Sequence, residues 1–201
     1  MDSSSSRQPV INAVAITVIV MCSIFIFWNM KTRRHRGSGD TMYSTSGEMI
    51  AAEIAKNVGK GNSVAIIGCK NPEFILGLDR DAMEEALQHA GVPIIGSEQL
   101  TPPGKTEDVY QFAQKYSSAS AVVMFLQDIL GPMPQLDPKG PKLIIIGGDP
   151  EWARTKCREG IASLVIARRP ESHQSNGNPT TPREKFDAIF EVIRPEAAPA
   201  P

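Results

Sequence analysis

The fold of this chain is decided by two short runs that are apolar almost throughout, Ala121-Val-Val-Met-Phe-Leu126 and Lys142-Leu-Ile-Ile-Ile-Gly147. Neither run alternates polar and apolar residues, as a strand with one face in water would. Continuous apolar runs are typical of parallel strands that helices cover on both faces. The two runs therefore predict a doubly wound α/β sheet.

The flanking sequence extends this pattern into a domain over residues 46–195. Apolar residues at helical spacing, with caps and glycine stops, predict helices. We expect helices over 47–58, 71–90, 107–116 and 150–159. Further apolar runs predict strands, and these cover 63–69, 92–96, 162–167 and 186–193. The prediction is a single, mainly parallel sheet with helices on both faces.

Three segments do not fit the alternation of helices and strands. Residues 131–141 are rich in proline, and residues 170–182 form a polar loop long enough to be partly disordered. The tail over 196–201 is low in complexity, and we expect it to be disordered.

An uncharged segment of 19 residues, Val10 to Trp28, precedes the domain. At about 1.5 Å per residue it reaches about 28 Å, close to the thickness of the hydrocarbon core of a bilayer. Its basic residues follow the apolar run, whereas those of a signal peptide would precede it. We therefore expect a tail over 1–9, a transmembrane helix over 10–28 that contacts the lipid bilayer, and a basic juxtamembrane segment and linker over 29–45.

The charges of the chain are distributed unevenly. Residues 1–36 carry five basic residues and one acidic residue, and the rest carries 16 basic and 21 acidic residues, a net charge of −5. An acidic domain disfavours nucleic acid as a partner. The basic flank from Lys31 to Arg36 predicts a single-pass protein with its C-terminal domain in the cytoplasm, and an extracytoplasmic domain is the alternative.

Catalytic and metal-binding motifs are missing from the sequence. It contains no GxxxxGK[ST], HExxH or GxSxG pattern. The three cysteines, Cys22, Cys69 and Cys157, have no metal-ligand spacing, and no histidine or aspartate is placed by a motif to activate Cys69. We predict no cofactor, no metal and no catalytic residue, and hence a protein that is not an enzyme.

Polar residues follow the predicted strands, where ligands bind in open α/β sheets. They are Lys70 and Asn71, Gln127 and Asp128, Asp149, and Arg168 and Arg169. The simpler interpretation is that residues in loops are polar because loops face water.

The order of several sequence pieces resembles a known family. The pieces are Gly47-Glu-Met-Ile-Ala-Ala-Glu-Ile, Gly59-Lys-Gly-Asn-Ser-Val-Ala-Ile-Ile-Gly, Arg80 with Met83-Glu-Glu-Ala-Leu, Phe125-Leu-Gln-Asp128, Ile145-Ile-Gly-Gly-Asp149, and Gly160-Ile-Ala-Ser-Leu-Val-Ile-Ala-Arg-Arg-Pro170. In order and spacing they resemble the second, C-terminal lobe of type I periplasmic sugar-binding proteins and of the related repressor ligand domains, without its partner lobe. The resemblance covers Ser46 to Pro170 and implies the fold of such a lobe. It also implies a set of ligand-binding residues that face a sugar, which are Arg80, Gln127, Asp128, Asp149 and Arg168.

Three classes of function follow from these observations. The first is a membrane-anchored, non-catalytic scaffold that docks another protein and is derived from a ligand-binding lobe. The second is a sensor of a small, polar, sugar-like molecule, completed by self-association or by a partner lobe. The third is an enzyme of unknown type.

Overall fold

The structure is a computed structural model that describes residues 41–68, 79–100, 104–125, 129–130, 132–170 and 180–195. The chain divides into two units, Met1–Gly39 and Asp40–Pro201, and every described residue belongs to the second. The predicted transmembrane segment over 10–28 lies outside the described residues. Within the described ranges, no helix is both long and apolar enough to span a bilayer.

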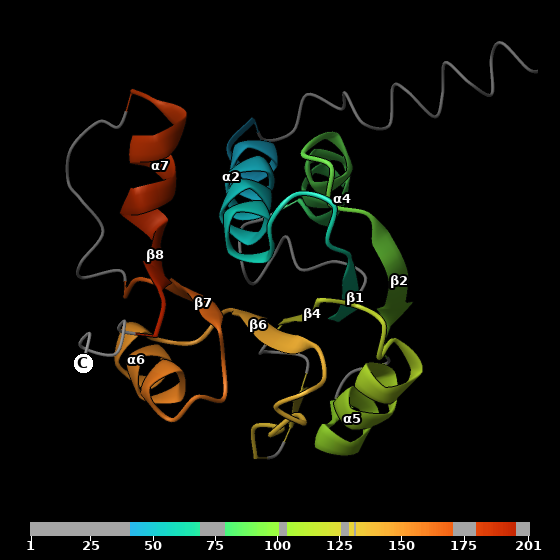
Figure 1. The fold of residues 1–201 in the computed structure, drawn as a ribbon. Coiled ribbons are helices and arrows are strands. Elements are labelled where there is room, and N and C mark those ends of the chain that lie inside the picture. Colours follow the sequence, from blue (N-terminus) through green and yellow to red (C-terminus); the bar gives the residue numbers. More distant parts are fainter. Residues whose placement is uncertain are drawn as a thin grey trace, which may run out of the picture. The chain divides into compact units, whose positions relative to one another are not determined.

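Helices and strands alternate along the second unit (Figure 1). The elements are α2 (Thr41–Val58), β1 (Val64–Gly68), α4 (Arg80–His89), β2 (Ile94–Gln99), β3 (Gly104–Lys105), α5 (Thr106–Lys115), β4 (Ala121–Phe125), β5 (Ile129–Leu130), β6 (Lys142–Ile146), α6 (Pro150–Arg158), β7 (Leu164–Arg168), α7 (Pro182–Ile189) and β8 (Phe190–Ile193).

Six of these strands form one sheet in the order β2-β1-β4-β6-β7-β8. The first five run parallel, and β8 pairs with β7 in the antiparallel direction. The short strands β3 and β5 pair in a separate two-stranded sheet. The predicted α/β class is therefore confirmed, with a sheet that is parallel in all but its last strand.

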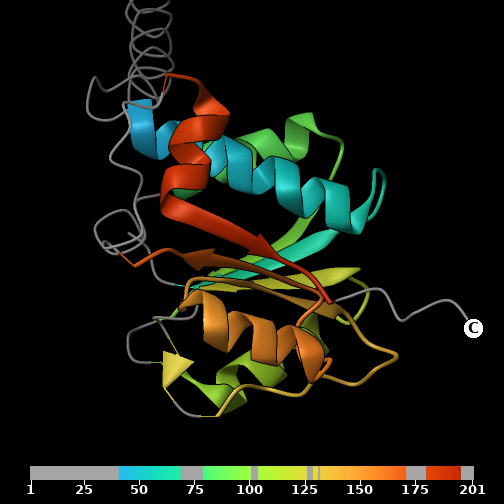
Figure 2. The ribbon, with the colours of Figure 1, turned by 90° about the vertical axis from the view of Figure 1, so that its left-hand side faces the viewer.

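Both faces of the sheet are covered, because alternate residues of each buried strand point to opposite faces. In β6, Ile144 and Ile146 belong to the core on one side, while Leu143 and Ile145 belong to the core on the other. Helices α2, α4 and α7 cover the first face and α5 and α6 the second (Figures 1 and 2). This double cover explains why the central strands are apolar throughout.

The strand predicted over 186–193 is wrong in its first half, because 186–189 belong to helix α7. Thr181 caps this helix, Pro182 occupies its first turn, and Glu184 completes a capping box. Hydrogen bonds from the backbone amides of Thr181 and Thr180 lower the pKa of Glu184 to about 2. Only residues 190–193 form a strand, because the residues before them make the hydrogen bonds of helix α7.

Two predicted helix starts also differ from the structure. Helix α2 begins at Thr41, so residues 41–45 are helical, whereas we expected a linker there. The helix predicted from Asn71 is described from Arg80, where the Asp79 carboxylate accepts a hydrogen bond from the Ala82 amide as the N-cap.

The connection between β4 and β6 contains no helix in its described part. Residues 132–141 form neither helix nor strand. They include four prolines, each of which lacks the backbone N–H that regular structure requires. Met133 and Leu136 of this segment pack against the core on the side of α5 and α6. The proline-rich segment thus covers sheet surface that a crossover helix would otherwise bury.

Candidate functional site

The predicted site lies at the carboxyl edge of the sheet, where β1, β4, β6 and β7 end. Three of its five residues, Arg80, Asp149 and Arg168, are described, and Gln127 and Asp128 lie outside the described residues. Strands β4 and β6 are neighbours, as the placement of Asp128 and Asp149 assumed.

Arg80 begins helix α4 and is only 5% exposed. Its guanidinium donates hydrogen bonds to Glu84 Oε1 (2.8 Å), Ser97 Oγ (2.8 Å) and the carbonyl oxygen of Gly68 (3.4 Å). It also lies over the ring of Phe125, 5.7 Å from the ring centroid. Arg80 therefore joins the ends of β1, β2 and β4, and much of its hydrogen-bonding capacity is used within the protein.

Asp149 is exposed and follows β6 through two glycines with positive φ, Gly147 (115°) and Gly148 (80°). Its Oδ1 accepts hydrogen bonds from the amides of Glu151 and Trp152, both at 3.0 Å, and thereby caps helix α6. A cap of this kind is worth about 1 kcal/mol to the helix. The carboxylate has a structural role, and one face of it remains open to water.

Arg168 is the exposed last residue of β7, and its amide donates to the carbonyl oxygen of Gly148 (2.9 Å). This bond brings Arg168 close to the turn that carries Asp149. Arg80 belongs to the β1 end of the same edge, and β4 lies between β1 and β6. With neighbouring strands about 4.8 Å apart, the two parts of the set are about 10 Å apart or more.

The structure adds an ion cluster to this edge that the sequence analysis did not find. Glu191 of β8 accepts a hydrogen bond from Arg154 of α6, and its Oε2 lies 3.3 Å from Nη1 of Arg169. Because β8 is antiparallel, its first residues reach the carboxyl edge, where Glu191 pairs with Ala167. No sequence motif predicts this contact, because Arg154 and Glu191 are 37 residues apart in the chain.

A cavity of about 940 Å³ lies at the opposite, amino edge of β6 and β7. Its lining includes Leu136, Pro141, Lys142, Ile161 and Pro195. None of the predicted ligand-binding residues lines it. This hollow of the described part is therefore separate from the predicted site.

Two observations in the described part of the chain concern metal binding and thiol chemistry. The described residues contain no cluster of three or more histidine, cysteine or acidic side chains that would hold a metal ion. Cys157 is buried, and this burial raises the pKa of its thiol, which donates to the carbonyl oxygen of Ile193 (3.7 Å). A protonated, buried thiol is a poor nucleophile. Cys69, which the sequence analysis considered and rejected as a nucleophile, lies outside the described residues.

Comparison with known proteins gives a likeness in structure alone. No protein-family model matches the chain, and no curated protein matches it in sequence. Solved structures similar to it include a periplasmic ribose transporter protein from Conexibacter woesei (20% identity, 62% of this chain and 45% of that chain, TM-score 0.49). They also include a glucose-galactose binding protein from Geobacillus stearothermophilus (16% identity, 81% of this chain and 63% of that chain, TM-score 0.49). An arabinose binding protein from the same organism is similar as well (13% identity, 78% of this chain and 61% of that chain, TM-score 0.48).

These structures belong to the class of sugar-binding proteins that the sequence resembles. This chain spans 45–63% of their length. With identities of 20% or less and TM-scores below 0.5, the likeness does not extend to a ligand or to the residues of a site.

Proposed function

We propose that this chain is a membrane-anchored, non-catalytic module that docks another protein through a single α/β lobe. The proposal rests on the contacts of Arg80. This side chain is buried and donates hydrogen bonds to Glu84, Ser97 and the Gly68 carbonyl oxygen. Recognition of a sugar needs donors and acceptors that are directed at its hydroxyl groups. Arg80 directs its donors at the fold, which supports a scaffold over a retained sugar site.

A sugar-like sensor, completed by a second copy or a partner lobe, is the second candidate. It is favoured by Asp149 and Arg168, which are both exposed and lie on the ends of neighbouring strands. A carboxylate beside a guanidinium offers paired acceptors and donors for hydroxyl groups.

Calorimetric titration separates the two candidates. We expect the full-length chain in detergent micelles to give no binding heat with ribose, arabinose, glucose or galactose at concentrations up to about 1 mM. This range detects a site with a binding free energy of about −4 kcal/mol or stronger. A saturable heat with any of these sugars would contradict the docking proposal and support the sensor.

Asp149→Asn is the matched control for that titration. Asparagine keeps the N-cap hydrogen bonds of α6 and removes only the charge, so the fold should retain its stability. If a sugar binds at the carboxyl edge, the substitution should weaken that binding at least tenfold, since a charged hydrogen bond is worth about 1.5–3 kcal/mol. A sugar response that Asp149→Asn leaves unchanged would place the ligand elsewhere.

The anchor is the second part of the proposal and rests on the uncharged run Val10 to Trp28 with its basic flank. We expect alkaline carbonate extraction to leave the chain in the membrane pellet. A reporter fused after Arg36 should report a cytoplasmic location. Release into the supernatant would contradict the anchor, and an active extracytoplasmic reporter would contradict only the orientation.

A further inference from the structure

The two outer strands of the sheet, β2 and β8, each pair with one strand among those that the structure describes. They lie at opposite ends of the sheet, β2 beside α4 and β8 between α7 and α6 (Figures 1 and 2). An outer strand presents a row of backbone N–H and C=O groups that a further strand can pair with.

Strand β2 is the more open of the two. It is six residues long, and its alternate residues Ile95, Ser97 and Gln99 are exposed. Ile95 is 41% exposed and is one of two large apolar side chains that are exposed in the described part of the chain. Lysine and proline, which commonly protect edge strands from pairing, do not occur between Ile94 and Gln99.

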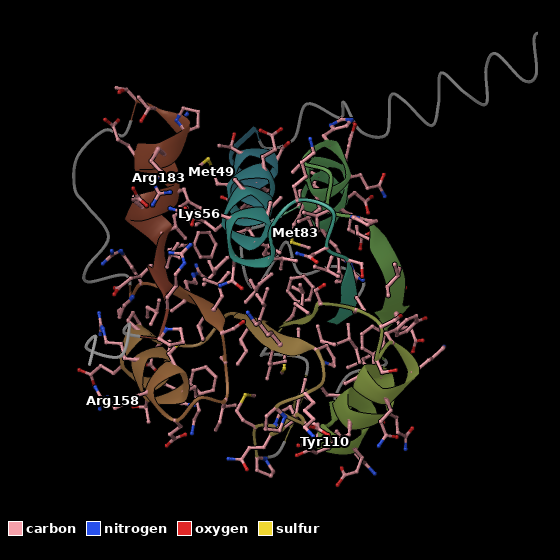
Figure 3. All side chains as sticks on the ribbon, viewed as in Figure 1. Met49, Lys56, Met83, Tyr110, Arg158 and Arg183 are labelled. Atoms are coloured by element: carbon pink, nitrogen blue, oxygen red, sulfur yellow. The ribbon has the colours of Figure 1, made fainter. Side chains whose placement is uncertain are left out.

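The two ends of the sheet carry opposite net charge. Residues 79–100, which form α4 and β2, contain five acidic residues and one arginine, a net charge of −4. The β8 end comprises residues 149–169 and 180–195, with six acidic and eight basic residues, a net charge of +2. Arg158 on α6 and Arg183 on α7 lie on either side of β8 (Figure 3).

This distribution of charge discriminates between the possible edge pairings of two copies. Pairing of β2 with β2 of a second copy brings two acidic ends together, and pairing of β8 with β8 brings two basic ends together. Like charges that are close across an interface oppose association, whereas opposite charges steer it. Only the pairing of β2 with β8 joins ends of opposite sign.

We propose that copies of this chain associate head to tail, with β2 of one copy adding to β8 of the next to continue the sheet. The proposal deepens the docking function by naming the partner as a second copy. Ile95 would be buried at the junction, and the four residues of β8 match part of the six of β2. A head-to-tail dimer leaves one β2 end and one β8 end unpaired, so the assembly grows beyond a dimer into a closed ring or an open filament.

Charge substitution at the two ends tests the proposal. Asp81→Lys with Glu85→Lys changes the net charge of the β2 end from −4 to 0, and Arg158→Glu with Lys185→Glu changes that of the β8 end from +2 to −2. These four side chains form no ion pair among the described residues, so the fold should remain intact. Sedimentation velocity of the full-length chain in detergent gives the readout, and circular dichroism confirms folding.

We expect the unmodified chain to grow past a dimer with concentration at about 50 mM salt, and to associate roughly tenfold more weakly at about 500 mM, where charges are screened. Each double variant alone should associate at least tenfold more weakly. An equimolar mixture of the two should regain association as a one-to-one complex, because the unmodified, acidic β2 end of one variant meets the unmodified, basic β8 end of the other.

Amide hydrogen exchange locates the contact. In the assembly, exchange should slow in β2 and β8 and remain unchanged in β4 and β6, the two central strands of the sheet. The proposal would be overturned if the unmodified chain stayed monomeric or stopped at a dimer. It would also be overturned if the mixture of the two double variants did not regain association. A sugar response in the titration above would contradict the docking function and leave this self-association standing, so the two failures are distinguishable.

Discussion

Replacing Gly47 by valine should destabilise the domain by about 3 kcal/mol or more, the upper end of the cost of overpacking. Gly47 lies in α2 where this helix crosses α4. A Cβ atom built on it would overlap the backbone oxygen of Asp79 and come within 3.1 Å of the backbone nitrogen of Met83. These are backbone atoms, which cannot rotate away as a side chain can. The two helices would have to separate, and urea unfolding followed by circular dichroism measures the loss.

Ala52→Val is the matched control for this substitution. Ala52 is exposed on the same helix, so valine there adds only the lower helix propensity of a β-branched residue, about 0.5 kcal/mol. The difference between the two variants isolates the contact between α2 and α4. Equal losses in both variants would contradict the close approach of the helices.

Glu53→Gln should lower the free energy of unfolding by about 2 kcal/mol, the range of hydrogen bonds between charged groups. Glu53 is 8% exposed and accepts hydrogen bonds from Arg183 and Arg194, both at 2.6 Å. It thereby holds α2 against α7 and against the residue that follows β8. Glutamine is neutral and has one acceptor oxygen, so both arginines lose their charged partner and one of them also loses its acceptor.

The same carboxylate should make stability depend on acidity. Burial raises the pKa of Glu53, but the hydrogen bonds and charges of Arg194 and Arg183 outweigh it and hold the pKa below the ordinary value of 4.5. Its contribution is thus fully present above pH 4.5 and is lost as the pH falls through the lower pKa of the folded state. Glu53→Gln should flatten this part of the pH profile.

Glu48→Gln provides the control for both measurements, because Glu48 is exposed on the same helix. It should change the stability by less than about 0.5 kcal/mol and leave the acid limb of the profile unchanged. An acid limb that survives in Glu53→Gln would show that other carboxylates produce it.

The central strands could be predicted from sequence because burial on both faces requires an uninterrupted run of apolar residues. A strand such as β4 touches helices on both faces, so every side chain from Ala121 to Phe125 is buried and apolar. Helix α7 was missed for the converse reason. Its apolar residues Phe186 and Ile189 run into those of β8, and the capping box at Thr181 and Glu184 distinguishes the two elements.

For the candidate site, the sequence could predict where Arg80 and Asp149 lie, but not which groups the Arg80 side chain contacts. Strand order and direction follow general rules of parallel sheets, and these placed Arg80 and Asp149 at the carboxyl edge. The partners of Arg80 depend on tertiary contacts, since Ser97 is 17 residues away in the chain. The direction of β8, which brings Glu191 to this edge, likewise has no signature in the sequence.

The reversed direction of β8 has a practical consequence for attaching probes. Because the strand runs from the carboxyl edge to the amino edge, Arg194 and Pro195 emerge beside the amino-edge cavity, and Pro195 lines it. A fluorophore or a surface-coupling group placed at Pro195 would leave Asp149 and Arg168 facing outward. Immobilisation at this position would therefore orient every molecule with its carboxyl edge toward an added partner, as a surface-based binding assay requires.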